Sequence, residues 1–529
     1  MAIVSPGQKH SGMPQNMLIA AILFSLISCT FGGQAARGNE NSFESVFRPV
    51  RDGGEAVTAI EVRSIINGAL EPDSGPLSVS APIVYASVQG IADRVIDLEV
   101  SDRHGDISLS REDDPVAAGG FPYFRHWRAE RDVVFPVTIT YRSGVEPPSD
   151  RRGPPFGIRS SAAGVSGAGS GFLVIPANVT STVSRVQWDL SDLAADSVAI
   201  SSFGEGEFEL NGPPAALMQG WFMAGPAGRY PDAGDANGFS ASWLGDFPFD
   251  ESAEMEWVGG AYAYLGEFFE YLNPPPRYRV FMRLLDTPPN RGGTALVNSF
   301  MLSRGPAEPE ELGGEGPRGT FFHEMIHQWV GGVEAPNGVS SWFSEGLTSY
   351  YTNLLPMLGG FATVDEYGEG LNEIASLYYS SATRDWSADR IAEAGFANEQ
   401  ARRIPYRRGA LYFADLDSRI RASSNGDRNL HVFMRELFEM REQEDFTFDH
   451  AKWIELVSAE VGPSAGGQFN DVIIEGALIV PASDAFGPCF ERRPRSVTAD
   501  DGTEFDGYEW IRLTSISDDA CRAHVNINN

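Results

Sequence analysis

The chain has 529 residues, of which 42% are apolar and 11% aromatic, so it can fill two or three hydrophobic cores. Its formal net charge is −32, from 72 acidic and 40 basic side chains. This acidity repels polyphosphate backbones and excludes nucleic acid as an expected partner. Because the acidic residues are spread along the chain, we interpret them as a solvated surface.

The one long apolar run lies near the N-terminus, in MLIAAILFSLISCTFGG at residues 17–33, and is typical of a secretory signal peptide. Within it, LISC resembles a bacterial lipobox, in which Cys29 would be lipidated after cleavage. Small residues at 34–36 offer ordinary cleavage instead, and an uncleaved anchor is a third outcome. No later stretch reaches the roughly 18 apolar residues that span a bilayer. We therefore expect an extracytoplasmic protein, either secreted or a periplasmic or outer-surface lipoprotein attached to the membrane through Cys29.

Residues 1–37 are thus predicted to be the signal peptide and a flexible N-terminus, and residues 38–235 have the pattern of strands and turns. Asp, Gly and Pro turn residues separate four β-rich stretches, at 56–63, 94–100, 133–141 and 183–190. This pattern predicts an N-terminal domain resembling a β-sandwich.

Helical spacing of apolar residues dominates the predicted second domain, residues 236–476. A helix at 257–272 and a strand at 278–285 precede six helical segments, at 320–330, 342–355, 364–379, 406–421, 430–441 and 451–457. The expected fold class is therefore α+β multidomain, with a mostly helical domain and a small sheet after the β-rich domain. In the tail, 477–529, an oxidising compartment favours a disulfide between Cys489 and Cys521, with two free thiols as the alternative.

The helical segment 320–330 contains His323-Glu324-Met325-Ile326-His327. Its two histidines are one turn apart on the same helix face, so both imidazoles can bind one metal ion. A hydrolytic zinc site needs a third protein ligand and one open position. Glu345 is the one carboxylate in the mostly apolar helix that follows. Seventeen residues separate it from His327, enough for a loop that brings it back antiparallel. The alternative is a core histidine pair with an unrelated glutamate.

These segments resemble the gluzincin metallopeptidases. WFSEGLTSYY at 342–351 and PYRRGALYFADLDSRIR at 405–421 look like the glycyl aminopeptidase family and, more distantly, the aminopeptidase N family. The resemblance implies a thermolysin-like catalytic domain holding one Zn²⁺ per chain, with His323, His327 and Glu345 as ligands and Glu324 as the catalytic base.

By the same resemblance, Tyr406 aligns with the tyrosine that stabilises the transition state. Pro405 is pre-shaped for a helix start, so we expect Tyr406 at the beginning of a helix with its phenol facing a cleft. The alternative is an interfacial tyrosine of the core.

Gly292 and Gly293 would let a peptide backbone approach the strand that starts at Thr294 and pair with it as an added strand. Related aminopeptidases carry a glutamate here that binds the free amine of the substrate, but RGGTALVNSF at 291–300 has no carboxylate. Glu308, Glu310 or Glu311 could supply one from nearby. Without such a residue, hydrolysis should not depend on a free N-terminus. The tail also lacks the pattern of the PDZ domain that ends glycyl family members.

We therefore expect a zinc metallopeptidase, aminopeptidase-like in its motifs, that acts on peptides or proteins. A catalytically degenerate peptidase serving as an extracytoplasmic binding protein is the alternative that the missing carboxylate supports. Glu324 argues against it, because a binding protein has no need of a catalytic base. Hydrolysis of a non-peptide bond at the same zinc is a third interpretation.

Overall fold

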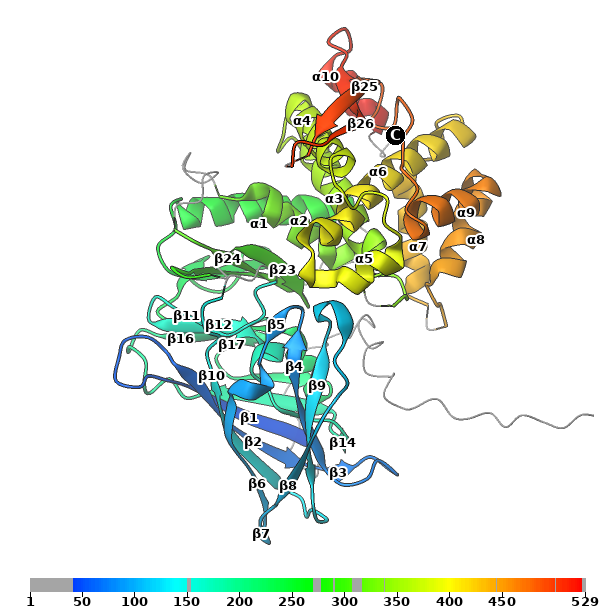
Figure 1. Ribbon diagram of the computed structural model, residues 1–529. Helices are drawn as coiled ribbons and strands as arrows, with labels where there is room; N and C mark the ends of the chain where they lie inside the picture. The colour runs from blue at the N-terminus through cyan, green and yellow to red at the C-terminus, as the bar shows by residue number, and fades with distance from the viewer. Residues whose placement is uncertain are drawn as a thin grey trace, which may run out of the picture.

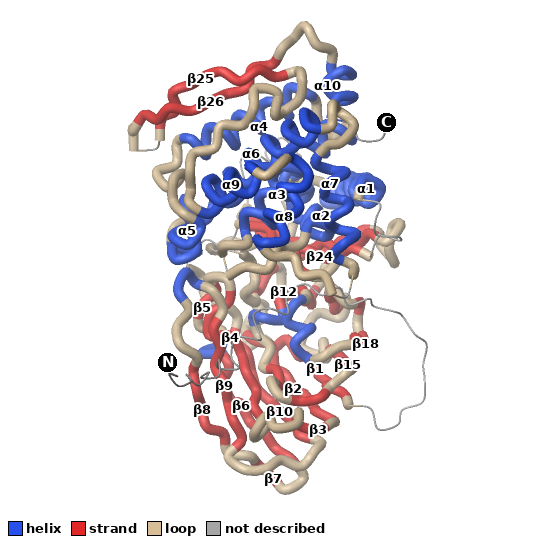
Figure 2. The backbone as a smooth tube through the Cα atoms, turned by 90° about the vertical axis from the view of Figure 1, so that its right-hand side faces the viewer, coloured by secondary structure: helices blue, strands red, loops and turns tan. Residues whose placement is uncertain are grey.

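The structure is a computed structural model, and it describes residues 41–149, 154–269, 277–288, 291–306, 316–336, 338–443, 445–499 and 501–525. The predicted signal peptide, Cys29 and the three glutamates at 308, 310 and 311 lie outside these residues. The β-rich part precedes the helical part in the chain, and the two lie at opposite ends of an elongated molecule (Figures 1 and 2). The predicted fold class is confirmed.

The largest sheet of the β-rich part has seven strands in the order β18-β15-β1-β2-β10-β6-β7. Neighbours pair antiparallel except β1 and β15, which are parallel. Side chains of β10 alternate between buried and partly exposed, as expected when one face of a sheet covers a core. The strands are β1 Ser42–Val50, β2 Ala59–Asn67, β6 Val95–Asp102, β7 Gly105–Asp106, β10 Val137–Gly144, β15 Val183–Trp188 and β18 Phe208–Asn211.

Two smaller sheets complete the β-rich part, in the orders β13-β4-β9-β8, with β5 paired to β4, and β11-β12-β19-β16-β17. Phe47, Phe172 and Phe222 pack edge to face between the sheets, with ring centroids 5.3–5.6 Å apart. The strands are β4 Ser78–Tyr85, β5 Val88–Gln89, β8 Leu109–Asp113, β9 Tyr123–Ala129, β11 Arg159–Ser161, β12 Gly164–Ala168, β13 Ile175–Pro176, β16 Val198–Ser201, β17 Gly204–Glu205 and β19 Trp221–Gly225, and a further pair joins β3 Ala69–Leu70 to β14 Val179–Thr180.

A mixed sheet in the order β20-β21-β22-β24-β23 lies between the β-rich part and the helices (Figure 1). Its strands are β20 Gly228–Tyr230, β21 Phe239–Leu244, β22 Tyr278–Leu284, β23 Gly292–Leu296 and β24 Ser299–Arg304. The three central strands run parallel, whereas β23 pairs antiparallel with β24 and forms an edge. β20 precedes the predicted domain boundary at 235/236 yet already pairs with β21.

Arg283 of β22 connects this sheet to the β-rich part. Its guanidinium is almost fully buried and donates to Ser303 Oγ and to the carbonyls of Pro155, Gly157 and Ser166, at 2.7–2.9 Å. A buried charge is tolerated only when its donors are satisfied. The side chain thus fixes the sheet against the loop that precedes β11.

Helices cover one face of the mixed sheet and form the rest of the helical part (Figure 2). They are α1 Glu251–Phe268, α2 Arg318–Val330, α3 Ser341–Gly359, α4 Val364–Tyr379, α5 Ala388–Ala394, α6 Glu399–Ser423, α7 Leu430–Arg441, α8 His450–Val461, α9 Ser464–Phe469 and α10 Asp518–Val525. The predicted bounds of α4 and α7 agree with the structure. Among the described residues, none of these helices combines the length and apolarity that crossing a bilayer requires.

The prediction that a helix starts beside Pro405 is wrong, because α6 begins at Glu399. Asn398 caps it by accepting a hydrogen bond from the Ala401 N–H at 3.0 Å. Pro405 therefore lies inside the helix, which costs about 3 kcal/mol in an isolated helix and must be offset by packing. The helix that carries Tyr406 thus includes residues 399–405, ahead of the predicted start at 406.

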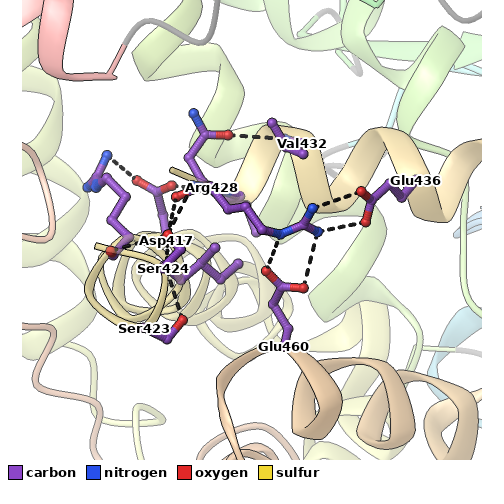
Figure 3. Close-up of polar contacts among 11 residues, drawn as sticks. Asp417, Ser423, Ser424, Arg428, Val432, Glu436 and Glu460 are labelled. Atoms are coloured by element: carbon purple, nitrogen blue, oxygen red, sulfur yellow. Dashed lines mark hydrogen bonds and ion pairs between the residues drawn. The ribbon is translucent and has the colours of Figure 1, made fainter. Parts of the chain in front are cut away.

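Arg428 fixes the far end of α6 (Figure 3). Its guanidinium forms two bonds each with Glu436 of α7 and Glu460 of α8, at 2.7–3.1 Å. Nearby, Asp417 of α6 accepts a hydrogen bond from the backbone N–H of Leu430, the first residue of α7. Three helices are therefore held in one orientation by charge-assisted bonds.

The C-terminal segment is a hairpin of β25 Phe490–Thr498 and β26 Glu504–Arg512, followed by α10. β26 lies against α4, where Asn372 bonds to the main chain of Trp510 in both directions. Cys489 and Cys521 form a disulfide with their Cα atoms 5.6 Å apart, so the predicted pairing is confirmed.

Candidate metal centre and active site

Two helices bring the predicted ligands together. His323 and His327 lie one turn apart on the same face of α2. The opposite face, which includes Phe322, Met325 and Ile326, is buried in the core, so the two imidazoles point away from it. α3 returns against α2 and places Glu345 between the two imidazoles. The Nε2 atoms of His323 and His327 lie 3.3 and 3.4 Å from Glu345 Oε2.

The distances from Glu345 to the two imidazoles fit a tetrahedral zinc ion. Ligands at about 2.0–2.1 Å from zinc in a tetrahedron are separated from one another by roughly 3.3–3.4 Å. Both Glu345 distances have this length, and all three donor atoms lie within 4.8 Å of one another. Two neutral imidazoles and one carboxylate leave the fourth position for water or substrate, which is the arrangement of catalytic zinc sites.

Two threonines of α3 orient the imidazoles, and the sequence analysis missed both. Thr352 Oγ1 lies 3.4 Å from His323 Nδ1 and already donates its proton to the Thr348 carbonyl at 2.8 Å. It can therefore only accept from the Nδ1–H, which leaves the Nε2 lone pair of His323 free for a metal. Thr348 Oγ1 contacts His327 Nδ1 at 3.3 Å.

The missed threonines had a signal in the sequence. Thr348 and Thr352 follow Glu345 at i+3 and i+7, so they share its face of the helix. Ser349, at i+4 from Glu345, also lies on this side of the helix. Among the described residues, its hydroxyl contacts neither imidazole, and its main-chain carbonyl accepts a hydrogen bond from Asn353 Nδ2.

The charges of the site are coupled. Burial alone would raise the pKa of Glu345, but the adjacent imidazoles of His327 and His323 hold it well below its ordinary value. Burial conversely lowers the pKa of His327, and the Glu345 carboxylate more than offsets this effect. Glu345 is thus an anionic donor at neutral pH, as a metal ligand must be.

Glu324 is in a different environment, although it lies next to His323 in the chain. Its side chain is only 8% exposed, and burial raises its pKa above the ordinary value. It accepts a hydrogen bond from the backbone N–H of Ala295 in β23. A carboxylate with a raised pKa beside a hydrolytic metal position can take and return a proton near neutral pH.

The predicted substrate-binding segment lies against this carboxylate. A Cβ atom at Gly293 would lie 2.9 Å from Glu324 Oε1 and 3.0 Å from Thr320 Cγ2, closer than side chains allow. Gly292 has a φ of 130°, which also favours glycine. Thr294 follows on the same strand, and its hydroxyl bonds to the Gly293 carbonyl. The strand backbone therefore passes close to the Glu324 carboxylate.

β23 brings no carboxylate to the site, because its sequence, GGTAL, contains neither Asp nor Glu. Asn298, in the turn to β24, accepts a hydrogen bond from Gln328 Nε2 at 3.0 Å instead. This contact ties the β23–β24 turn to the residue after His327.

Tyr406 reaches the site from α6. Its ring stacks on the His323 ring at a centroid distance of 5.9 Å and an interplanar angle of 14°. Burial raises the pKa of its phenol, which therefore stays protonated and can donate a hydrogen bond. The structure thus brings all five predicted metal and catalytic residues together, with Glu324 next to β23.

A close helix crossing sets the position of Tyr406. α3 and α6 meet at Gly346 and Gly409, and a Cβ atom at Gly346 would lie 2.6 Å from the Gly409 Cα. Glu345 and Tyr406 flank this crossing on their respective helices. Any side chain at the crossing would push the Glu345 carboxylate and the Tyr406 phenol apart.

Comparison with known proteins relates this site to peptidases. The sequence model of the M61 glycyl aminopeptidase family matches residues 317–409, which hold the three ligands, Glu324 and Tyr406. No curated protein sequence matches the chain. The resemblance inferred from the motifs is confirmed, and the family match supports peptidase function in general.

Solved structures show the same fold. An aminopeptidase N family protein from Idiomarina loihiensis has a TM-score of 0.66 at 14% identity, over 87% of this chain and 81% of that one. A mutant M1 zinc metallopeptidase from Deinococcus radiodurans, bound to a Tyr-Ser-Ala substrate, has a TM-score of 0.50 at 16% identity, over 84% and 95%. Yeast LTA4 hydrolase in complex with bestatin has a TM-score of 0.52 at 12% identity, over 84% and 68%.

Proposed function

We propose that the chain is a zinc-dependent peptidase that holds one Zn²⁺ through His323, His327 and Glu345 and uses Glu324 as its general base. The observation that carries the proposal is the donor geometry, in which both imidazoles lie at zinc-ligand spacing from one carboxylate oxygen. A buried carboxylate on the same helix, beside an edge strand, adds what hydrolysis requires.

When bound, zinc supplies Lewis-acid polarisation of the scissile carbonyl and makes water more acidic. Glu324 takes a proton from the attacking water as the carbon–oxygen bond forms. It then gives a proton to the leaving nitrogen as the carbon–nitrogen bond breaks, so the base is restored. The Tyr406 hydroxyl donates to the developing oxyanion, and loss of one such donor typically costs about 10² to 10³ in rate.

β23 supplies the binding surface for a peptide. One edge of β23 pairs with β24, and among the described residues no strand pairs with its other edge. An extended substrate can add to that edge through main-chain bonds. Gly293 keeps the approach to Glu324 free of a side chain.

The absence of a carboxylate on β23 leads to a proposal about the substrate terminus. An aminopeptidase must neutralise an ammonium ion in a partly desolvated cleft, and a hydrogen-bonding group without charge cannot do so. We infer that N-acetylated peptides are cleaved with a kcat/KM within about tenfold of their free counterparts, or ~1.4 kcal/mol. A preference of a hundredfold or more for the free amine would show that another acidic residue supplies the anchor.

A peptide-library digest read by mass spectrometry tests the function itself. The zinc-loaded protein should cleave peptides, and the same sample after chelation should not. Intact peptides together with stoichiometric zinc would favour the binding-protein alternative. Turnover of an ester or another non-peptide bond alone would favour the third interpretation.

The location of the protein is a separate proposal, supported by the apolar run at residues 17–33. We infer export, with lipid attachment at Cys29 as the form to test first. Metabolic labelling with a palmitate analogue should mark the parent and not Cys29→Ala. Equal labelling of both, or of neither, would leave plain secretion.

A further inference from the structure

The first turns of α6 carry a charged cluster that the catalytic mechanism does not use. Arg402 forms a two-bond fork with Glu399, at 2.8 and 2.9 Å, and Arg403 Nε donates to the same carboxylate at 3.0 Å. Two guanidinium groups therefore share one carboxylate, which leaves one positive charge unbalanced within the cluster. The chain as a whole has a net charge of −32, so this local surplus is opposite in sign to the total.

The cluster adjoins the catalytic tyrosine. The guanidinium carbon of Arg403 lies 5.3 Å from the Tyr406 ring centroid, and that ring stacks on His323. Arg402 is also within electrostatic reach of the site: burial would lower its pKa, but Tyr406, Glu399 and Glu345 together raise it above the ordinary value. Arg402 therefore stays charged beside Tyr406.

The two arginines differ in what they still offer to a ligand. The Arg402 side chain is 17% exposed and uses its fork on Glu399, whereas the Arg403 side chain is 44% exposed. Among the described residues, the polar contact of Arg403 uses only Nε, so both of its Nη groups remain for another acceptor. A partly exposed guanidinium held over an aromatic ring is well placed to bind a planar anion.

We propose that Arg403, supported by Arg402 and Glu399, forms a subsite that binds a carboxylate of the substrate. The inference rests on the proposed peptidase function and adds a preference to it. Glu399 has the role of holding both guanidinium groups beside Tyr406, and the bound carboxylate balances the remaining positive charge. The subsite thereby selects acidic peptides by attraction.

Distance limits where that carboxylate can lie in the substrate. The path from the His323 ring through Tyr406 to Arg403 has two steps, of 5.9 and 5.3 Å. An extended peptide advances ~3.3–3.6 Å per residue, so the guanidinium lies within about three residues of the scissile bond. The carboxylate can come from an Asp or Glu side chain in that range or from the C-terminus of a short peptide.

The test uses one neutral, C-terminally amidated peptide and two kinds of variant. The first kind places Glu instead of Gln at each position within three residues of the cleavage point, and the second has a free C-terminal carboxylate. In the unmodified protein, one of these should raise kcat/KM by about tenfold or more, as expected for a charge-assisted bond. The position of the gain distinguishes a side-chain carboxylate from a terminal one.

Arg403→Gln should lower the acidic-to-neutral ratio of kcat/KM to below about threefold, mainly through KM. Losses shared by both peptides cancel in this ratio. Arg495→Gln is the matched control, because Arg495 is 49% exposed and pairs with one glutamate, Glu509, at 3.0 Å in the distant hairpin. It removes the same charge and should keep the tenfold ratio.

Each result decides a different question. Cleavage of all peptides with an acidic-to-neutral ratio near one overturns the subsite and leaves the peptidase proposal intact. An unchanged ratio in Arg403→Gln, or an equal fall in Arg495→Gln, also overturns it. If the zinc-loaded protein cleaves none of the peptides, the proposed function fails, and the subsite fails with it.

Discussion

Replacing Thr352 by valine removes one hydroxyl and nearly preserves the shape of the side chain. The hydroxyl accepts from His323 Nδ1 at 3.4 Å, close to the upper limit for a hydrogen bond. Loss of a partner that orients a metal-bound histidine typically costs 10–100-fold in metal affinity, and the long distance places Thr352 at the low end. We expect about a tenfold weaker zinc affinity, or ~1.4 kcal/mol.

The measurement is a zinc titration against a competing chromogenic chelator at fixed pH, with circular dichroism to show that the fold is retained. Ser349→Ala is the control, because it removes a hydroxyl from the same helix that, among the described residues, contacts neither imidazole. Zinc affinity of Thr352→Val equal to that of the parent would refute the role of the threonine. An equal loss in Ser349→Ala would attribute the effect to α3 as a whole.

Four further changes test other parts of the structure. Glu324→Gln should retain stoichiometric zinc and lose turnover, and cleavage near the parent rate would contradict its role as the base. Tyr406→Phe should lower kcat by about 10² to 10³ and change KM less, whereas an unchanged kcat would make it a core residue. Reducing the disulfide, whose cysteines are 32 residues apart, should lower the denaturant-derived stability by roughly 3–4 kcal/mol, and an unchanged midpoint would contradict this. Burial lowers the pKa of His431 to about 3, below its unfolded value, so its neutral form is needed in the fold. Stability should therefore fall by about 1.4 kcal/mol per pH unit below pH ~6, and His431→Leu should remove this part of the pH dependence in urea titrations. Identical slopes for the parent and His431→Leu would contradict the assignment.

The clustering of the candidate metal ligands was predictable because its signal is local. His323 and His327 lie in one helix whose buried face is set by apolar spacing, so their common direction follows from the helical period alone. Glu345 required only one further inference, that the next helix returns antiparallel. Thr348 and Thr352 follow from the same period, and finding them would have required extending the helix-face argument from Glu345.

The start of α6 was not predictable from Pro405, although proline favours helix starts. A helix interior accepts proline only when packing offsets its cost, and packing is a property of the tertiary structure. Asn398 was the competing local signal, since asparagine is a preferred N-cap residue. The buried contacts of Arg283 could not be predicted from the sequence either, because its carbonyl acceptors are more than 100 residues away in the chain.

The glycine crossing of α3 and α6 has a consequence for inhibitors. No side chain separates the helices at Gly346 and Gly409, so no rotamer change can let them slide past each other. The gap between the metal position and the Tyr406 phenol is therefore preset, and a rigid mimic of the tetrahedral transition state should find it without first reshaping the protein. Inhibitor groups placed along β23, by contrast, contact the outer edge of a sheet. An inhibitor should therefore gain most of its affinity from the preset gap beside Tyr406, and its selectivity from groups that contact β23.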